Sequence, residues 1–315
     1  MRAMAADGHG TKAVIAAFFA NLGIAIMKFI GFAFTGSGAM LAEGVHSSAD
    51  TGNQLLLLLG GKKARKSPDE ERQFGYGRER YFWAFVVAVM LFSVGALFSI
   101  YDGIEKLQHP HELESVEWAI GILLGAIVLE IFSFRTAIVG ARKVKGNSSW
   151  WRFIRTSKSP ELPVVLLEDL AALLGLVFAL CAVLVADATG DPMYDAIGSL
   201  TIGVLLGAVA IVLAIEMRSL LLGEAAQPEV QKQIADTIEQ QPLVTSLIHL
   251  RTEHIGPDEL LVAAKVEFSS DLTLQELADV VNEVETAIRR NVPEALVIYL
   301  EPDVARMASK AIVTE

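Results

Sequence analysis

Six long apolar segments alternate with polar connections over the first two thirds of the chain. They cover residues 13–34, 38–61, 81–104, 117–141, 162–187 and 193–222. A helix needs roughly 17–25 mostly apolar residues to cross about 30 Å of hydrocarbon, and every segment reaches that length. The pattern therefore predicts an all-α membrane domain with six transmembrane helices.

The connections between these segments differ in their content of Lys and Arg. The 62–80 and 142–160 connections carry seven and six basic residues, whereas the 35–37 and 188–192 turns carry none. Short connections rich in Lys and Arg remain on the cytoplasmic side of a membrane. We therefore expect a multi-pass protein of the cell (inner) membrane with both termini in the cytoplasm.

The last 90 or so residues follow the pattern of a small α+β domain. The expected elements are a helix between Pro228 and Pro242, strands at 245–255 and 259–268, a helix ending near Asn291, and a strand at 295–301. Thr273 and Glu276 have the spacing of a capping box at the start of the second helix. The order α-β-β-α-β fits a ferredoxin-like open sheet with helices on one face. We expect a transport domain at 1–223 and a cytoplasmic domain at 224–315.

Composition narrows the class of protein further. The chain is 53% hydrophobic and 20% charged, with a mean hydropathy of +0.46, which excludes disorder. The single cysteine, Cys181, excludes a disulfide scaffold and a Cys-based zinc site. The net charge of −11 argues against nucleic acid as a partner, and residues 224–315 account for −10 of it.

The second apolar segment carries a polar stripe. Glu43, His46, Asp50 and Asn53 lie at i, i+3, i+7 and i+10, which places them on one face of a helix. His46 and Asp50 are four residues apart, so their side chains are neighbours on that face. Imidazole and carboxylate at this spacing make half of a tetrahedral site for zinc or a similar divalent ion. The alternative is a hydrogen-bonded stripe that holds helices together.

The fifth apolar segment contains two adjacent acids, Glu168 and Asp169. Two neighbouring carboxylates in hydrocarbon repel each other or become protonated. A cation shared with His46 and Asp50 would remove that conflict, so we predict metal ligation by His46, Asp50, Glu168 and Asp169. The alternative is one neutral acid packed between helices. Glu130 in the fourth segment is expected to reach other helices, and Lys28 in the first to serve packing.

Three motifs resemble those of the cation diffusion facilitator family of divalent-metal transporters, and the resemblance covers nearly the whole chain. The segment Ala-Glu-Gly-Val-His46-Ser-Ser-Ala-Asp50 is similar to the family's second-span metal motif. The segments Phe74–Arg78 and Asp191–Ser199 resemble those that lead into the third and sixth spans. Asp169 falls where the family has the second carboxylate of its fifth-span motif.

The chain also departs from the family pattern. Val165 stands where many members carry His or Asp, and the adjoining Glu168 resembles a divergent branch that includes the animal mitochondrial zinc transporter. Glu168 is therefore expected to be the fourth ligand or the proton carrier beside it. The rival interpretation turns Glu168 toward another helix such as the one carrying Lys28, and completes the metal site with water or Asn53.

The tail departs as well, at the places where some family members bind zinc. By this resemblance, these places hold Ile248, Ala278 and Leu300, so we expect no zinc pair in the tail and surface positions for His249 and His254. The zinc site that some members have in the loop before the third span is also expected to be absent, because Arg72 and Tyr76 replace its histidines.

The resemblance implies efflux of a divalent cation in exchange for protons, by a homodimer in a lipid bilayer, with no enzymatic activity and no cofactor besides the transported metal. Zinc fits one imidazole with carboxylates, whereas the oxygen-rich ligand set keeps manganese, iron and cobalt open. A metal-responsive membrane scaffold without transport and a passive channel are the other classes that the residues leave open.

Overall fold

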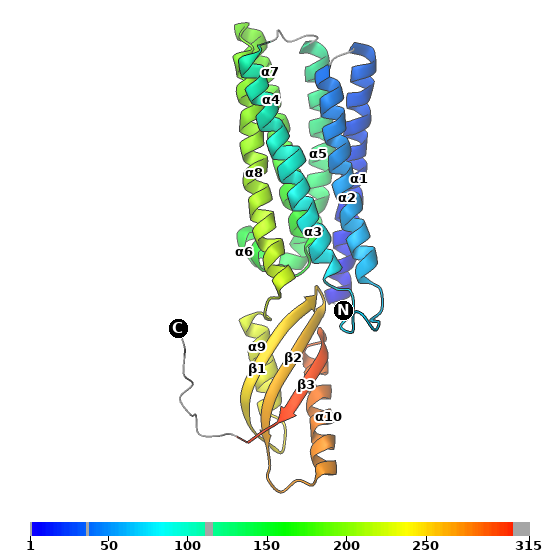
Figure 1. The fold of residues 1–315 in the computed structure, drawn as a ribbon, viewed down its shortest axis with the longest axis vertical. Helices are drawn as coiled ribbons and strands as arrows, with labels where there is room; N and C mark the ends of the chain where they lie inside the picture. Colours follow the sequence, from blue (N-terminus) through cyan, green and yellow to red (C-terminus); the bar gives the residue numbers. More distant parts are fainter. Residues whose placement is uncertain (1, 36–37, 111–115, 305–315) are drawn as a thin grey trace. The chain divides into compact units, whose positions relative to one another are not determined.

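The computed structural model describes residues 2–35, 38–110 and 116–304, with side chains described except at 2–9, 34–35, 38–43, 45 and 46. The chain forms two compact units, Met1–Leu221 and Leu222–Glu315. The first unit is helical and the second is a three-stranded sheet with two helices (Figure 1). We describe each unit by itself.

Long helices of the first unit coincide with the predicted spans. They are α1 (Arg2–Thr35), α2 (Gly38–Ala64), α3 (Glu79–Met90) continued through η1 (Leu91–Ala96) into α4 (Leu97–Gln108), α5 (Val116–Lys145), α7 (Glu161–Thr189) and α8 (Met193–Leu222). A short helix that the sequence did not predict, α6 (Trp150–Thr156), lies in the basic connection between α5 and α7. The fold class is therefore as predicted.

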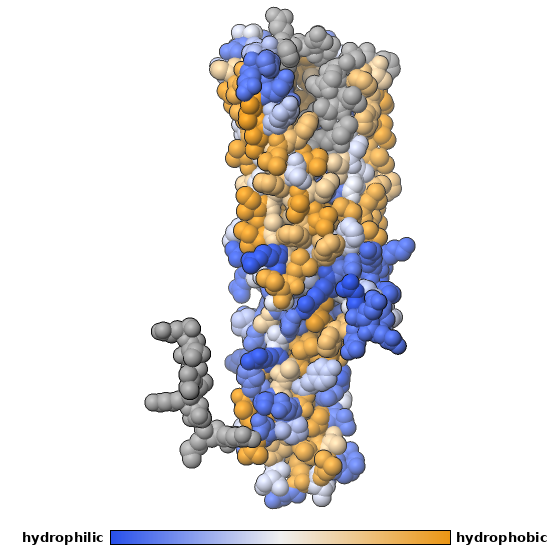
Figure 2. Space-filling view, in the orientation of Figure 1, coloured by the Kyte–Doolittle hydropathy of each residue, from blue (hydrophilic) through white to orange (hydrophobic). Residues whose placement is uncertain are grey.

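Among the described residues, five stretches are long and apolar enough to cross a membrane: Gly10–Ala33, Glu79–Gln108, Val116–Lys145, Glu161–Thr189 and Met193–Leu222. The helix α2 is not among these stretches, although its 27 residues are enough to span a membrane, and it carries the polar stripe. Figure 2 shows apolar side chains over most of the visible face of this unit, with hydrophilic ones gathered toward its ends. Lipid can cover such a band.

The helices α1, α2, α5 and α7 pack together and form the part of the unit that contains the predicted site. The helix α1 contacts α2, α5 and α7, and α5 contacts α7. Small residues such as Ala17 on α1 and Ala137 on α5 are fully buried. Small side chains let helix backbones approach closely in a membrane protein, so polar groups on these helices can meet one another.

The third span is divided by the π-helical turn η1. Below it, α3 contacts α2 and α7. Above it, α4 lies against α8, where a Cβ at Gly203 would come within 2.6 Å of the Ile100 side chain. An ion-pair network supports this contact, because Lys106 Nζ lies 2.8 Å from Asp102 and 2.9 Å from Asp195. The two halves of one span thus have different neighbours.

The second unit has the predicted order α9 (Pro228–Glu239), β1 (Val244–Gly256), β2 (Glu259–Phe268), α10 (Leu274–Asn291) and β3 (Ala295–Pro302). The sheet order is β1-β2-β3, with β1 and β2 antiparallel and β2 and β3 parallel. Alternate residues of β2, from Leu260 to Val266, are buried together with Ile238 of α9 and Val284 of α10. One face of the sheet is therefore covered by helices.

Candidate metal centre

Glu168 of α7 is held by two amides of α2. Its Oε1 accepts a hydrogen bond from Asn53 Nδ2 at 3.1 Å, and its Oε2 accepts one from Gln54 Nε2 at 2.7 Å. All three side chains are buried. Both carboxylate oxygens thus have neutral donors, which orient the group without cancelling a negative charge.

Asp169 has its partner on a different helix. Ser133 of α5 donates a hydrogen bond from Oγ to Asp169 Oδ2 at 2.7 Å, and both residues are almost fully buried. Glu168 therefore ties α7 to α2, while Asp169 ties α7 to α5. Neighbours in sequence lie about 100° apart around a helix, so two adjacent acids can reach two different helices.

Asp50 brings a third acid to this region from α2. It is half-buried, and its charge acts on both Glu168 and Glu130. The charges of three of the four predicted ligands, Asp50, Glu168 and Asp169, therefore act on Glu130. The fourth, His46, belongs to α2 one turn before Asp50, and its side chain is outside the described residues.

Glu130 of α5 is a further member of the cluster, which the sequence predicted to reach other helices but did not include among the ligands. It is 1% exposed, and the charges of Asp169, Asp50 and Glu168 all act on it. Glu130 precedes Ser133 by three residues, so both lie on the face of α5 that meets α7. That spacing between an acid and a serine in an apolar helix is the signal in the sequence that could have identified it.

Three buried oxygens around the cluster have no hydrogen-bond donor among the described residues. They are Asn53 Oδ1, Gln54 Oε1 and Glu130 Oε1. Buried polar atoms in proteins are nearly always paired, so such an accumulation in one place is unusual. Oxygen atoms of this kind are acceptors for a proton, a water molecule or a hard cation.

The acids do not converge to coordination distance. Within the described part of the chain, no group of three or more His, Cys, Asp or Glu side chains is close enough to hold a metal ion. The region is thus a cluster of buried acids linked through neutral donors from α2 and α5.

The motif Phe74–Arg78, in the connection after α2, lies in a loop held by hydrogen bonds. Gly75 has a φ of +83°, and its N–H donates to the Arg72 carbonyl at 2.9 Å. Hydrogen bonds from Lys66 and Tyr76 hold the pKa of Asp69 well below its usual range.

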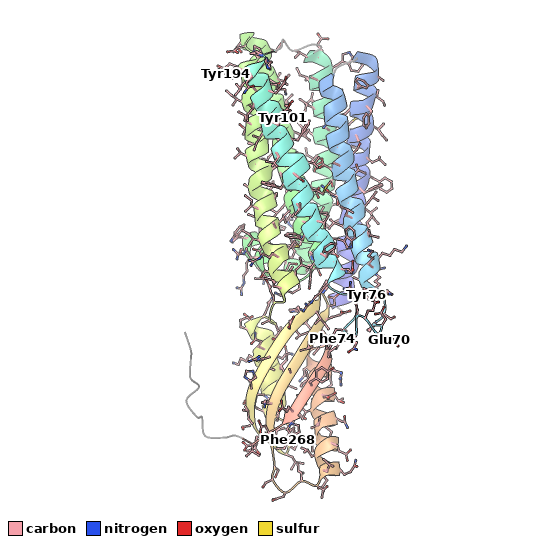
Figure 3. All side chains as sticks on the ribbon, in the orientation of Figure 1. Glu70, Phe74, Tyr76, Tyr101, Tyr194 and Phe268 are labelled. Atoms are coloured by element: carbon pink, nitrogen blue, oxygen red, sulfur yellow. The ribbon has the colours of Figure 1, made fainter. Side chains whose placement is uncertain are left out.

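Phe74 and Tyr76 lie at one end of the helical unit, and Tyr101 and Tyr194 lie toward the other (Figure 3). Aromatic side chains are typical of both edges of a membrane.

The tail holds one departure from expectation. His249 is exposed, as predicted, and its Nε2 accepts a hydrogen bond from Arg251 Nε at 2.7 Å. His254 is only 3% exposed, so the prediction of a surface position is wrong for this residue. It lies near the end of β1, where its backbone N–H donates to the Glu224 carbonyl at 2.8 Å. The segment preceding α9 thus pairs with this end of the strand and covers it.

Apolar helices that enclose a cluster of acids, joined to a separate αββαβ unit, define a multi-pass membrane protein that handles cations. Family comparison agrees with this class. Residues 14–222 match the model described as the cation efflux transmembrane domain, and residues 226–303 match the cytoplasmic domain of cation efflux proteins. The chain belongs to the cation efflux family, and the predicted resemblance to cation diffusion facilitators is confirmed. This family contains transporters rather than enzymes.

Individual relatives carry more specific names. The mitochondrial proton-coupled zinc antiporter SLC30A9 of Xenopus laevis is 36% identical over 282 residues, which are 87% of this chain and 50% of that protein. Metal tolerance protein C4 of Arabidopsis thaliana is 31% identical over 85% of this chain and 59% of its own length. Magnetosome protein MamB of Magnetospirillum gryphiswaldense is 25% identical over 90% of both chains. The chain thus spans about half the length of the first two curated relatives.

Proposed function

We propose that this protein exports a divalent cation from the cytoplasm by exchange with protons, through one site between α2 and α7. His46, Asp50, Glu168 and Asp169 are the proposed ligands. The observation that carries the proposal is the burial of Glu168 and Asp169 among apolar helices, where their oxygens accept hydrogen bonds from neutral amide and hydroxyl donors. Buried negative charge costs free energy unless a cation or a proton neutralises it.

Exchange with protons follows from the chemistry of these ligands. Carboxylates and imidazole bind a metal only when they are deprotonated, so metal and protons compete for the same groups. Alternating exposure of the site to the two sides of the membrane converts that competition into antiport. Binding would draw the acids closer together than they now lie, with His46 completing the set.

Zinc is the proposed cargo, because one imidazole with carboxylates is a common zinc ligand set. The similarity to the Xenopus relative, which is named as a zinc antiporter, supports this choice. Manganese, iron or cobalt export by the same route is the alternative, favoured by the number of oxygen atoms around the site.

A metal-responsive scaffold without transport is the second candidate function. It is favoured by Val165 in the place of a family ligand and by the lack of a converged group of three ligands among the described side chains. A scaffold of this kind would move no metal across a membrane, so transport measurements separate the two functions.

The membrane location and the assembly complete the proposal. The basic connections between α2 and α3 and between α5 and α7 support an orientation with both termini in the cytoplasm, in a cell (inner) membrane. Two copies are proposed to pair through their tail domains, without nucleic acid or a resident cofactor. Protease accessibility of the tail in sealed vesicles tests the orientation.

The decisive experiment measures metal uptake into proteoliposomes driven by a pH gradient, with Zn²⁺, Mn²⁺, Fe²⁺ and Co²⁺ compared. We expect Zn²⁺ uptake by the wild type and its loss in His46→Ala, Asp50→Ala and Asp169→Ala. Asp187→Ala is the matched control, because it removes an exposed carboxylate from the same helix α7 as Asp169. Wild-type flux in Asp50→Ala would rule out a transport site here, and no flux in the wild type would favour the scaffold.

A further inference from the structure

Lys28 is a buried basic residue in the apolar part of α1. Its side chain is 5% exposed, and its Nζ donates a hydrogen bond to Ser47 Oγ of α2 at 2.9 Å. Ser47 lies next to His46 and three residues before Asp50. The ammonium group therefore reaches the turn of α2 that carries two of the proposed ligands.

The charge of Lys28 acts on the acid cluster itself. Glu130 of α5 experiences the negative charges of Asp169, Asp50 and Glu168 and the positive charge of Lys28. The other basic side chain that is buried in the described part of the helical unit is Arg80, whose Nε lies 3.4 Å from Glu161 at the starts of α3 and α7. Lys28 thus differs from it in lying near the acids on which the proposed function depends.

A lysine in this position has two consequences for a cation site. Attraction to the acids offsets part of their mutual repulsion, which is strong where water is excluded. Repulsion acts on any metal ion that enters the same cluster, and it is doubled for a divalent ion because the energy scales with charge. The buried oxygens of Glu130, Asn53 and Gln54 that find no donor among the described residues mark this cluster as a place that can accept a cation.

We propose that the Lys28 ammonium competes with the transported cation for the acid cluster. Its positive charge is offset by Glu130, and Ser47 accepts its hydrogen bond when the metal enters. This inference rests on the proposed function and adds a residue that sets affinity and release. Without such a competitor, a site rich in buried carboxylates would hold a divalent ion too tightly to release it quickly. Lys28 therefore favours rapid release of the metal ion over tight binding.

A purely structural role makes different predictions, because a link between α1 and α2 needs a hydrogen-bond donor but no charge. Lys28→Gln retains a donor and removes the charge, whereas Lys28→Arg retains the charge. If Lys28 only joins the helices, Gln at this position behaves like the wild type. If its charge competes with the metal, Arg behaves like the wild type and Gln does not.

The test measures equilibrium Zn²⁺ binding to the full chain in detergent and Zn²⁺ uptake in proteoliposomes. We expect Lys28→Gln to tighten binding by at least about tenfold, a change of about 1.4 kcal/mol, and to slow uptake at saturating Zn²⁺. Glu130→Gln is expected to weaken binding by a similar factor, and the double variant to return to within about threefold of the wild type. Arg135→Gln, which removes an exposed positive charge from α5, is the control and should change neither quantity.

Zn²⁺ uptake by the wild type together with an unchanged affinity in Lys28→Gln overturns this inference and leaves the proposed function standing. Absence of both binding and uptake in the wild type overturns the proposed function. Thermal unfolding then decides whether Lys28 balances Glu130: each single variant should lower Tm, and the double variant should recover it. Strictly additive losses of Tm would contradict the charge pairing.

Discussion

At the scale of residues, the two adjacent acids of α7 illustrate how one helix serves two neighbours. Glu168 accepts hydrogen bonds from Asn53 and Gln54 on α2, whereas Asp169 accepts one from Ser133 on α5. Val165, fully buried, lies one turn before them. Relative to Val165, Glu168 lies about 60° to one side of the helix and Asp169 about 40° to the other. Both can therefore border the place of the missing family ligand.

Glu168→Gln is expected to weaken Zn²⁺ binding by at least about tenfold and to reduce proton coupling in the same variant. The change removes a charge. It also replaces one acceptor oxygen by an NH2 group, which cannot accept the hydrogen bond that Asn53 or Gln54 donates there. Adding Val165→His should restore part of the binding, because an imidazole then occupies the family's ligand position. Zn²⁺ titration and pH-dependent uptake measure the two effects.

Normal transport by Glu168→Gln, with unchanged pH dependence, would show that Glu168 is structural and that three protein residues bind the metal. The Asp187→Ala variant controls for the loss of a carboxylate from α7.

At the scale of elements, local signals in the sequence account for where most helices and strands begin and end. Pro228 starts α9, and Thr273 caps α10 by accepting a hydrogen bond from the Glu276 N–H. The π turn η1 and the helix α6 were not predicted. A π turn is a rare irregularity inside an otherwise regular helix, and α6 has only seven residues, too few to show a clear period.

Thr273→Ala is expected to destabilise the tail by about 1 kcal/mol, the usual effect of losing an N-cap. The measurement is thermal or urea unfolding of residues 222–315. Thr286→Ala is the control, because Thr286 lies in the same helix and its hydroxyl donates only to the Asn282 carbonyl one turn earlier.

The pH dependence of the same pair has a defined sign. Hydrogen bonds from Thr273 hold the pKa of Glu276 below its ordinary value of 4.5. The stability that this pair contributes is therefore complete above pH 4.5 and is lost as the pH falls through the lowered pKa. The difference in the free energy of unfolding between the wild type and Thr273→Ala should decrease in acid. A difference that increases there would contradict this assignment.

At the scale of the whole molecule, the charge of the chain is divided between its two units. The tail carries nearly all of the net negative charge, whereas the helical unit is almost neutral. The tail also has its own core, built from residues such as Ile234, Leu260 and Ile288, which are fully buried. A domain with its own core can fold by itself.

Residues 224–315 are expected to fold and to dimerise in the absence of metal. The physical reason is that Ile248 is 38% exposed and cannot ligate zinc, and Ala278 and Leu300 likewise offer no ligand atom. Circular dichroism and sedimentation equilibrium in the presence of a chelator measure folding and assembly. A tail that unfolds or becomes monomeric on chelation would show that metal holds it together.

The order of elements and the identity of the acids were determined by the sequence alone. Hydrophobic runs of membrane length and period-two strands are local patterns, and an acid in an apolar run stands out without knowledge of its neighbours. The acid cluster was predictable only in part: the sequence singled out Asp50, Glu168 and Asp169, whereas it predicted a packing role for Lys28 and gave Glu130 no role beyond reaching other helices. Their place beside the cluster depends on how α1 and α5 are rotated against α2 and α7, and that rotation follows from packing between residues far apart in the chain. The tertiary structure therefore decided which donor meets which carboxylate, because hydrogen bonds such as those from Ser133 and Asn53 join helices whose relative rotation no local pattern encodes.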